Sequence, residues 1–319
     1  MKLNLALAMA LVAAILISLM AGRTWVPFEQ WLSGNMASLI VMELRLPRAC
    51  IGALVGGSLG MAGAAMQGYL RNPLADPGLF GVSSSAALGA VVSLFFGYAV
   101  QAWLLPLFAL AGAGMGMALL ALLAGRSGSL ILFTLAGVIL SSLTGALTSL
   151  LISLAPTPFA SSEIVTWLMG ALIDRSWDDL KIALPIVAGG MVALLWAARW
   201  LDALTLGEMA ARSLGVNMAR LQVLIVLGVG LCVGGTVAIA GIIGFVGLVV
   251  PHLMRPLVEH RPSALLIPSA LAGGLLVVLA DSLVRILPST SEVRLGIAMS
   301  VLGAPFFLML LHKMRRDVA

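Results

Sequence analysis

The sequence predicts an all-α polytopic membrane protein, with about ten transmembrane helices in a single domain that spans residues 1–319. Three observations predict this class: 61% of the residues are hydrophobic, only 10% are charged, and the mean hydropathy is +1.12. Soluble domains carry roughly a quarter charged residues. A helix needs about 20 apolar residues to cross a bilayer, so the apolar content suffices for about ten crossings.

The expected helices follow the apolar runs in chain order. The first run, 3–20, exceeds the 7–15 residues typical of a signal-peptide core, so we expect a retained helix, with a cleaved signal peptide as the alternative. Residues 23–45 are of mixed polarity and predict an external connection. Residues 155–179 are amphipathic and predict a segment that lies at the interface or across a pore mouth. The remaining helices are expected at 46–70, 82–97, 100–124, 130–153, 180–199, 221–242, 244–256, 263–287 and 295–312.

The basic residues orient this arrangement in the membrane. With both termini in the cytoplasm, eleven of the 18 lysines and arginines fall on the cytoplasmic side, as the positive-inside rule requires. These residues are Lys2, Arg71, Arg126, Arg199, Arg212, Arg220, Arg255, Arg261, Lys313, Arg315 and Arg316. The net charge of +5 is therefore ascribed to orientation in the bilayer, so membrane lipid is an expected partner and nucleic acid is not.

Motifs for catalysis and metal binding do not occur in the sequence. None of the three lysines follows a glycine, so there is no GxxxxGK[ST] phosphate loop and any ATP would be hydrolysed by a partner. The sequence has no HExxH, and Cys50 and Cys232 are too far apart for a CxxC site. We expect no catalytic residue, metal site or cofactor in this chain. An intramembrane hydrolase would lack a recognisable nucleophile and base.

One carboxylate, Asp281, lies well inside an expected span. Proton-coupled transporters generally need ionisable groups within the membrane. An ion-coupled secondary transporter therefore remains only as an alternative. Asp281 precedes Arg285 by one helical turn, which predicts a local ion pair.

The largest expected cytoplasmic segment, 200–222, predicts a short helix, a tight turn and a second helix. Thr205 and Glu208 have the spacing of a capping box. Gly215 can adopt the left-handed conformation that ends a helix, and Asn217 can cap the next one. The segment is either an ordinary connection or a docking element for a cytoplasmic partner.

Two further groups of polar residues have both a functional and a structural interpretation. Arg45, Arg48 and Arg285 are expected at the outer face, where they could dock a protein or extend to lipid headgroups. Thr134, Ser141, Thr144 and Thr148 form a weakly polar stripe on one helix, three of them at seven-residue intervals. Such a stripe can line a pathway or pack against another helix.

Several segments resemble the permease subunit of the iron-siderophore, haem and cobalamin importers, which are type II ABC importers. These segments cover nearly the whole chain in order. They are ELRLPR (43–48), the run GALVGGSLGMAGAAMQGYLRNPLADPGLFGVSSSAALGA (52–90), LTLGEMAARSLGV (204–216), GIIGFVGLVVPHLMR (241–255), LADSLVR (279–285) and LGAPFF (302–307).

The resemblance implies a permease in the bacterial inner membrane, with a ferric siderophore as the first expected substrate and haem or cobalamin as alternatives. It implies a second permease subunit, identical or paralogous, two cytoplasmic ATPases that hold ATP and Mg²⁺, and a periplasmic substrate-binding protein. It assigns binding-protein docking to Arg45, Arg48 and Arg285, and supports a pathway along Thr134, Ser141, Thr144 and Thr148. The implied ATPase-docking residues are Leu206, Gly207, Glu208, Ala211, Arg212, Leu214 and Gly215.

Overall fold

The described part of the chain is helical, without a β-strand. The computed structural model describes residues 2–22, 24–101, 103–124, 130–287 and 292–318. Its α-helices are α1 (Lys2–Met20), α2 (Met36–Leu39), α3 (Leu46–Leu70), α4 (Val82–Phe95), α5 (Leu104–Ala124), α6 (Leu130–Ser153), α7 (Pro158–Leu168), α8 (Trp177–Leu204), α9 (Glu208–Ser213), α10 (Met218–Ala240), α11 (Val246–Met254), α12 (Pro262–Ile286) and α13 (Leu295–Val318).

Each of the ten expected apolar runs contains a helix. Among the described residues, seven helices are long and apolar enough to cross a membrane. They are α1, the continuous Met36–Leu70 helix, α5, α6, α8, α10 and α12, whereas α4, α11 and α13 are shorter apolar helices. The all-α membrane fold is therefore confirmed, while ten complete crossings and cytoplasmic termini stay predictions. Arg126, one of the eleven basic residues expected on the cytoplasmic side, lies outside the described residues.

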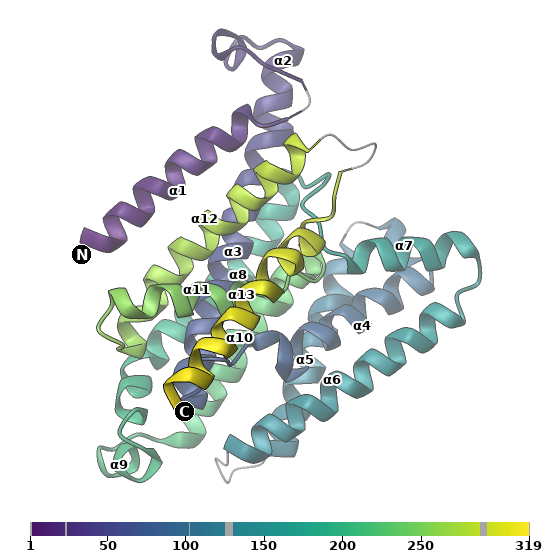
Figure 1. Cartoon of the computed structure of the whole chain (residues 1–319). Helices are drawn as coiled ribbons and strands as arrows, with labels where there is room; N and C mark the ends of the chain where they lie inside the picture. The colour runs from purple at the N-terminus through teal and green to yellow at the C-terminus, as the bar shows by residue number, and fades with distance from the viewer. Residues whose placement is uncertain (1, 23, 102, 125–129, 288–291, 319) are drawn as a thin grey trace.

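The long helices pack around α3 and α10 (Figure 1). α3 contacts α12, α8, α10 and α11, while α1 lies along α12 at one side of the molecule. On the other side, α4, α5 and α6 form a second group, with α7 lying across its upper end. α9 projects at the lower end, away from the other helices.

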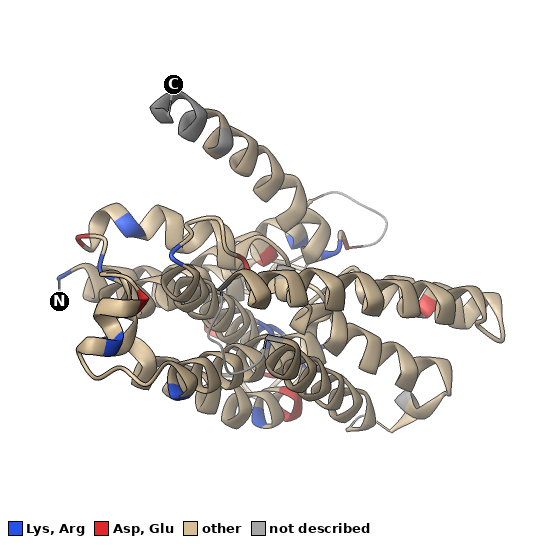
Figure 2. Cartoon of the chain, turned by 90° about the horizontal axis from the view of Figure 1, so that it is seen from below, with Lys and Arg blue, Asp and Glu red and all other residues tan. Residues whose placement is uncertain are grey.

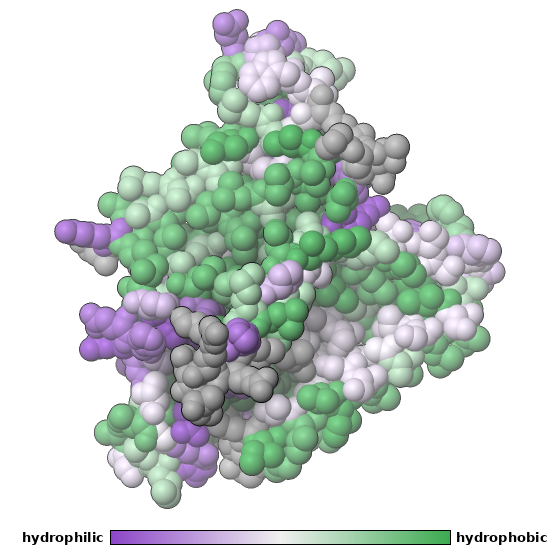
Figure 3. Space-filling model, viewed as in Figure 1, coloured by the Kyte–Doolittle hydropathy of each residue, from purple (hydrophilic) through white to green (hydrophobic). Residues whose placement is uncertain are grey.

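The surface of this bundle suits a lipid environment. Apolar residues cover most of the face in Figure 3, and hydrophilic residues gather near the ends. Figure 2, seen from below, shows that charged residues are sparse along the ribbon. A surface of this kind has no favourable contact with water but is compatible with hydrocarbon.

The helix that contains α3 begins ten residues earlier than expected. Asn35 caps α2, its Oδ1 accepting from the amide of Ser38 at 3.1 Å. A π-helical segment, Ile40–Arg45, then leads directly into α3. The wider turn carries the helix past Pro47, which has no N–H to donate. The expectation of an external connection throughout 23–45 is therefore wrong for its second half.

Glycines on α3 allow close packing against α11 and α12. An added Cβ at Gly56 would meet the carbonyl oxygen of Gly273, and one at Gly63 would meet that of Gly247. These contacts are with backbone atoms, which cannot move aside as a side chain can. Close approach through small residues is a common way for membrane helices to associate, and here it fixes the centre of the bundle.

We expect the substitution Gly63→Ala to destabilise the bundle by about 1–3 kcal/mol, because the added methyl group must push α11 away from α3. Gly114→Ala is the matched control, since a Cβ there meets nothing within 4 Å. The thermal unfolding midpoint of each purified variant in detergent measures the difference. Equal midpoints would show that α3 and α11 are not tightly packed in the protein.

Candidate functional site

The projecting α9 and its flanking residues, Leu206–Gly215, form an apolar tip that we term the α9 element. Leu206, Met209 and Leu214 expose 68%, 85% and 64% of their surface, while Ala211 is buried against the bundle. Glu208 and Arg212 form an ion pair across one turn, with 2.6 Å between Oε1 and Nη2. A tip that combines an anchored base, exposed large apolar groups and internally paired charges is suited to burial against another protein.

The ends of the α9 element partly follow the sequence expectation. Gly215 has a φ of +86° and Asn217 caps α10, its Oδ1 accepting from the amide of Arg220, so both predictions are confirmed. The prediction of a capping box at Thr205 and Glu208 is wrong. Thr205 still has helical dihedrals at the end of α8, and its hydroxyl donates to the carbonyl of Asp202.

Replacing Gly215 with valine should cost about 1–2 kcal/mol, because L-residues disfavour the left-handed conformation. No atom lies within 4 Å of an added Cβ there, so the cost would be conformational and not steric. Gly215→Asn should be better tolerated, since asparagine visits this region more readily. Thermal unfolding separates the cases, and a valine variant as stable as the asparagine variant would contradict the prediction.

The three outer-face arginines are buried, with 6%, 9% and 5% of Arg45, Arg48 and Arg285 exposed. The guanidinium groups of Arg45 and Arg285 stabilise the end of α1. Arg45 donates to the carbonyls of Leu19 at 2.8 Å and Thr24 at 2.6 Å, and Arg285 donates to that of Ser18 at 3.1 Å. The last carbonyls of a helix lack partners within it and attract cations. Two distant arginines therefore cap a helix that has no basic residue in its own last turn.

Asp281 connects the remaining arginine, Arg48, to Arg285. Its carboxylate lies 2.8 Å from Nη2 of Arg48 and 3.2 Å from Nε of Arg285. Glu292 also accepts from Arg48, at 2.8 Å. The predicted pair of Asp281 with Arg285 is confirmed and is part of a larger network. The three arginines are buried and bonded within the chain, so extension to lipid headgroups is not seen, and binding-protein docking through them stays a prediction that requires these bonds to open.

The polar stripe of α6 divides between two environments. Thr134 and Ser141 line a cavity of about 580 Å³ together with residues from the loop between α3 and α4. Thr148 is half-buried. Thr144 is buried instead, with its Oγ1 2.8 Å from both Ser84 Oγ and the carbonyl oxygen of Leu140. The expectation that Thr144 lines a pathway is wrong in this structure, because its hydroxyl is used for packing against α4.

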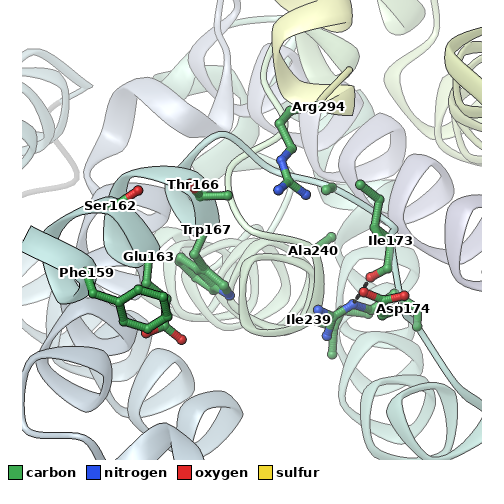
Figure 4. A pocket seen from close by; sticks show the side chains of 12 residues that line it. Phe159, Ser162, Glu163, Thr166, Trp167, Ile173, Asp174, Ile239, Ala240 and Arg294 are labelled. Atoms are coloured by element: carbon green, nitrogen blue, oxygen red, sulfur yellow. Dashed lines mark hydrogen bonds between the residues drawn. The ribbon is translucent and has the colours of Figure 1, made fainter. Parts of the chain in front are cut away.

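A second cavity, of about 380 Å³, lies beside α7 (Figure 4). Its walls carry Phe159, Glu163 and Trp167 from α7, Asp174 from the following loop, and Arg294. The guanidinium of Arg294 points into the cavity from the segment before α13. Within the described residues, its side chain forms no hydrogen bond or ion pair. The sequence places Arg294 at the outer face with Arg45, Arg48 and Arg285 but does not assign it to docking, and among these four it is the arginine whose guanidinium is not used within the described part of the chain.

Comparisons with known proteins decide the family. The model of the FecCD transport family matches residues 10–313. The chain belongs to the FecCD transport family. Among the described residues of this FecCD chain, no group of three or more His, Cys, Asp or Glu side chains could hold a metal ion.

Curated relatives of the FecCD chain are permeases of ABC transporters. The uncharacterized ABC transporter permease YvrB of Bacillus subtilis is 41% identical over 289 residues, which cover 88% of this chain and 81% of YvrB. The vitamin B12 import permease BtuC of Salmonella typhi is 37% identical over 318 residues, 98% of this chain and 95% of BtuC. The FecCD chain is thus a type II ABC importer permease of the inner membrane and not a catalytic subunit.

A solved structure has the same fold as the FecCD chain. It is described as an inward-facing conformation of a metal-chelate type ABC transporter. It is 34% identical in sequence, with a TM-score of 0.90, and covers 98% of this chain and 99% of its own. The arrangement of helices around α3 and α10 is therefore an ABC permease fold.

Sequence reasoning about this FecCD permease did not single out Met209. This side chain is the most exposed of the large apolar side chains in the α9 element, yet methionine at that place could equally have faced the bundle. The helical pattern of a six-residue helix is too short to separate its two faces. Its position opposite the buried Ala211 could be recognised only from the structure.

Proposed function

We propose that this permease imports a metal chelate, with a ferric siderophore as the first candidate, across the inner membrane at the expense of ATP hydrolysed by partner subunits. The observation that carries the proposal is the apolar α9 element on a chain whose family consists of transport permeases. The solved relative of metal-chelate type supports this class of substrate.

The assembly that this function requires contains two permease subunits, two ATPases with their ATP and Mg²⁺, and a binding protein. α6 supports the pairing of permeases, because Ile131, Leu135 and Ile139 are exposed along it. Such a face can be covered by a second permease subunit as well as by lipid. Whether that subunit is an identical copy or a paralogue is decided by the composition of the purified complex.

Coupling would run through the α9 element. Only three residues separate α8 from α9, and the capped turn at Asn217 leads directly into α10. A displacement of the α9 element therefore acts on the ends of two long helices. ATP-driven closure of the ATPases would favour one of two access states of the pathway in this way.

Cobalamin is a second candidate substrate. BtuC, a vitamin B12 import permease, is 37% identical over nearly the whole chain. Cobalamin and ferric siderophores are both bulky chelates, so a wide pathway with few charged groups would admit either. Selection between them would be made by the binding protein.

The transport assay uses proteoliposomes that contain the permease, its ATPase and its binding protein. Radiolabelled ferric siderophore, haem and cobalamin are supplied separately, with ATP enclosed in the vesicles. ATP-dependent accumulation of the siderophore supports the proposal. If cobalamin or haem accumulates and the siderophore does not, that chelate is the substrate instead. Uptake driven by an ion gradient in the absence of the ATPase would refute the ABC mechanism and favour a secondary transporter.

A further inference from the structure

A small cavity of about 200 Å³ lies beside the base of the α9 element. It is enclosed by the last turns of α3, the first turn of α12, the loop before α12 and the end of α8. A water molecule occupies about 30 Å³ in the liquid, so the volume admits one phosphate group and a few waters. The lining residues are Ala64, Gln67, Gly68, Arg71, Thr205, Arg255, His260, Pro262 and Leu265.

The charged and titratable groups in this lining are basic. Arg255 donates from Nη2 to Oε1 of Gln67 at 2.7 Å, while its Nε is buried without a partner. The guanidinium of Arg71 forms no hydrogen bond or ion pair within the described chain. His260 adds a third polar side chain to the lining. The buried Nε of Arg255 is withdrawn from water without an acceptor, which is costly. The guanidinium of Arg71 is exposed on the same lining, so an anion that contacts both groups would be stabilised here.

Two neighbouring carboxylates are used elsewhere, and a third, Glu259, is exposed beside His260 and does not line the cavity. Asp202 accepts from the amide of Ser263 at 2.8 Å and from its hydroxyl, and so caps the start of α12. Glu208 is paired with Arg212. Neither of these acids lines the cavity. The positive charge of Arg71 and Arg255 is therefore left for a group from outside the chain.

The surroundings favour a lipid over a soluble partner as the source of that anion. Two walls belong to α3 and α12, which are long enough to span a membrane. Leu253 and Leu257 are exposed on either side of Arg255 and offer apolar contact to acyl chains. In Figure 3 a hydrophilic patch lies just above α9, below the broad apolar surface. Basic pockets between membrane helices at this level are suited to lipid phosphates.

We propose that this cavity binds the phosphate group of an anionic phospholipid, held by Arg71 and Arg255 with His260 at its rim. Bound there, the lipid would contact α3, α12 and Thr205 at the base of the α9 element. The proposal does not depend on the transported substrate or on the direction of transport.

Binding is measured by native mass spectrometry of the full chain in detergent, titrated with phosphatidylglycerol or phosphatidylcholine of identical acyl chains. Removing one basic contact at a membrane surface costs about fivefold in affinity, so Arg71→Gln and Arg255→Gln should each weaken phosphatidylglycerol binding about fivefold. Arg220→Gln, which removes a basic residue outside the cavity, is the matched control. Arg71→Lys, which retains the charge, should restore most of the affinity.

The outcomes separate the alternatives. Preferential binding of phosphatidylglycerol that is lost in Arg71→Gln and kept in Arg220→Gln supports the proposal. Equal affinity of all variants, or equal affinity for phosphatidylcholine, overturns it. Inorganic phosphate and glycerol 3-phosphate are tested as competitors of phosphatidylglycerol. If either saturates the cavity at the concentration at which the lipid does, the ligand is a free phosphate and not a lipid. Arg255 also contacts Gln67. If Arg255→Gln does not fold, the comparison of Arg71→Gln with Arg71→Lys still tests whether the cavity binds the lipid.

Discussion

Replacing Asp281 with alanine should destabilise the chain by about 3–5 kcal/mol, because it leaves two buried guanidinium groups without their shared carboxylate. Arg48 keeps Glu292, but Arg285 loses its only acidic contact among the described residues. The measurement is the thermal unfolding midpoint of the purified protein in detergent.

Two companion variants make this prediction specific. Asp178→Ala breaks the ion pair with Lys181, both of whose side chains are exposed, and should leave the midpoint unchanged. The double variant Asp281→Ala, Arg285→Met should recover part of the loss, because Arg48 keeps Glu292 and the guanidinium that would lack a carboxylate is removed. A midpoint for Asp281→Ala that equals that of Asp178→Ala would mean that the network is not formed.

Truncating Met209 and Leu214 together to alanine should weaken binding of the partner ATPase at least about thirtyfold. Central apolar residues of a protein interface contribute about 2 kcal/mol or more, and 1.4 kcal/mol corresponds to tenfold in affinity. The pair lies on the exposed side of the α9 element, so its removal leaves the packing of Ala211 intact. Affinity is measured with permease in nanodiscs and labelled ATPase, and transport should fall in parallel.

Leu32 provides the matched control for this experiment. It is 85% exposed, as is Met209, but it lies in the segment before α2, at the opposite end of the molecule. Leu32→Ala should leave ATPase affinity unchanged. Loss of ATPase binding in both variants, or in neither, would remove the α9 element as the docking surface.

Local features of the chain could be predicted from the sequence. Gly215 and Asn217 act within one turn of helix, and their types determine their conformations. The apolar runs likewise located every long helix, because hydropathy depends only on neighbouring residues. Thr205 was misassigned for a related reason: its spacing to Glu208 fits a cap, but whether α8 has already ended there depends on tertiary packing.

Long-range features could not be predicted. The burial of Arg48 depends on Asp281, 233 residues later in the chain, and no pattern in the sequence connects the two. Arg45 and Arg285 bind backbone carbonyls at the end of α1, and a carbonyl has no sequence signature at all. The same limit applies to the cavity between α3 and α12, whose arginines follow the ends of two separate helices, α3 and α11.

The sequence separation within the Asp281 network also imposes an order on biogenesis. Arg48 is synthesised well before α12, since chains are made from the N-terminus and fold progressively. Until α12 inserts, the guanidinium of Arg48 must remain in contact with water or headgroups at the membrane surface. Closure of the network then marks the moment at which the N-terminal helices and the C-terminal third of the chain have met. A chain that ends before residue 281 would lack both carboxylates that pair with Arg48.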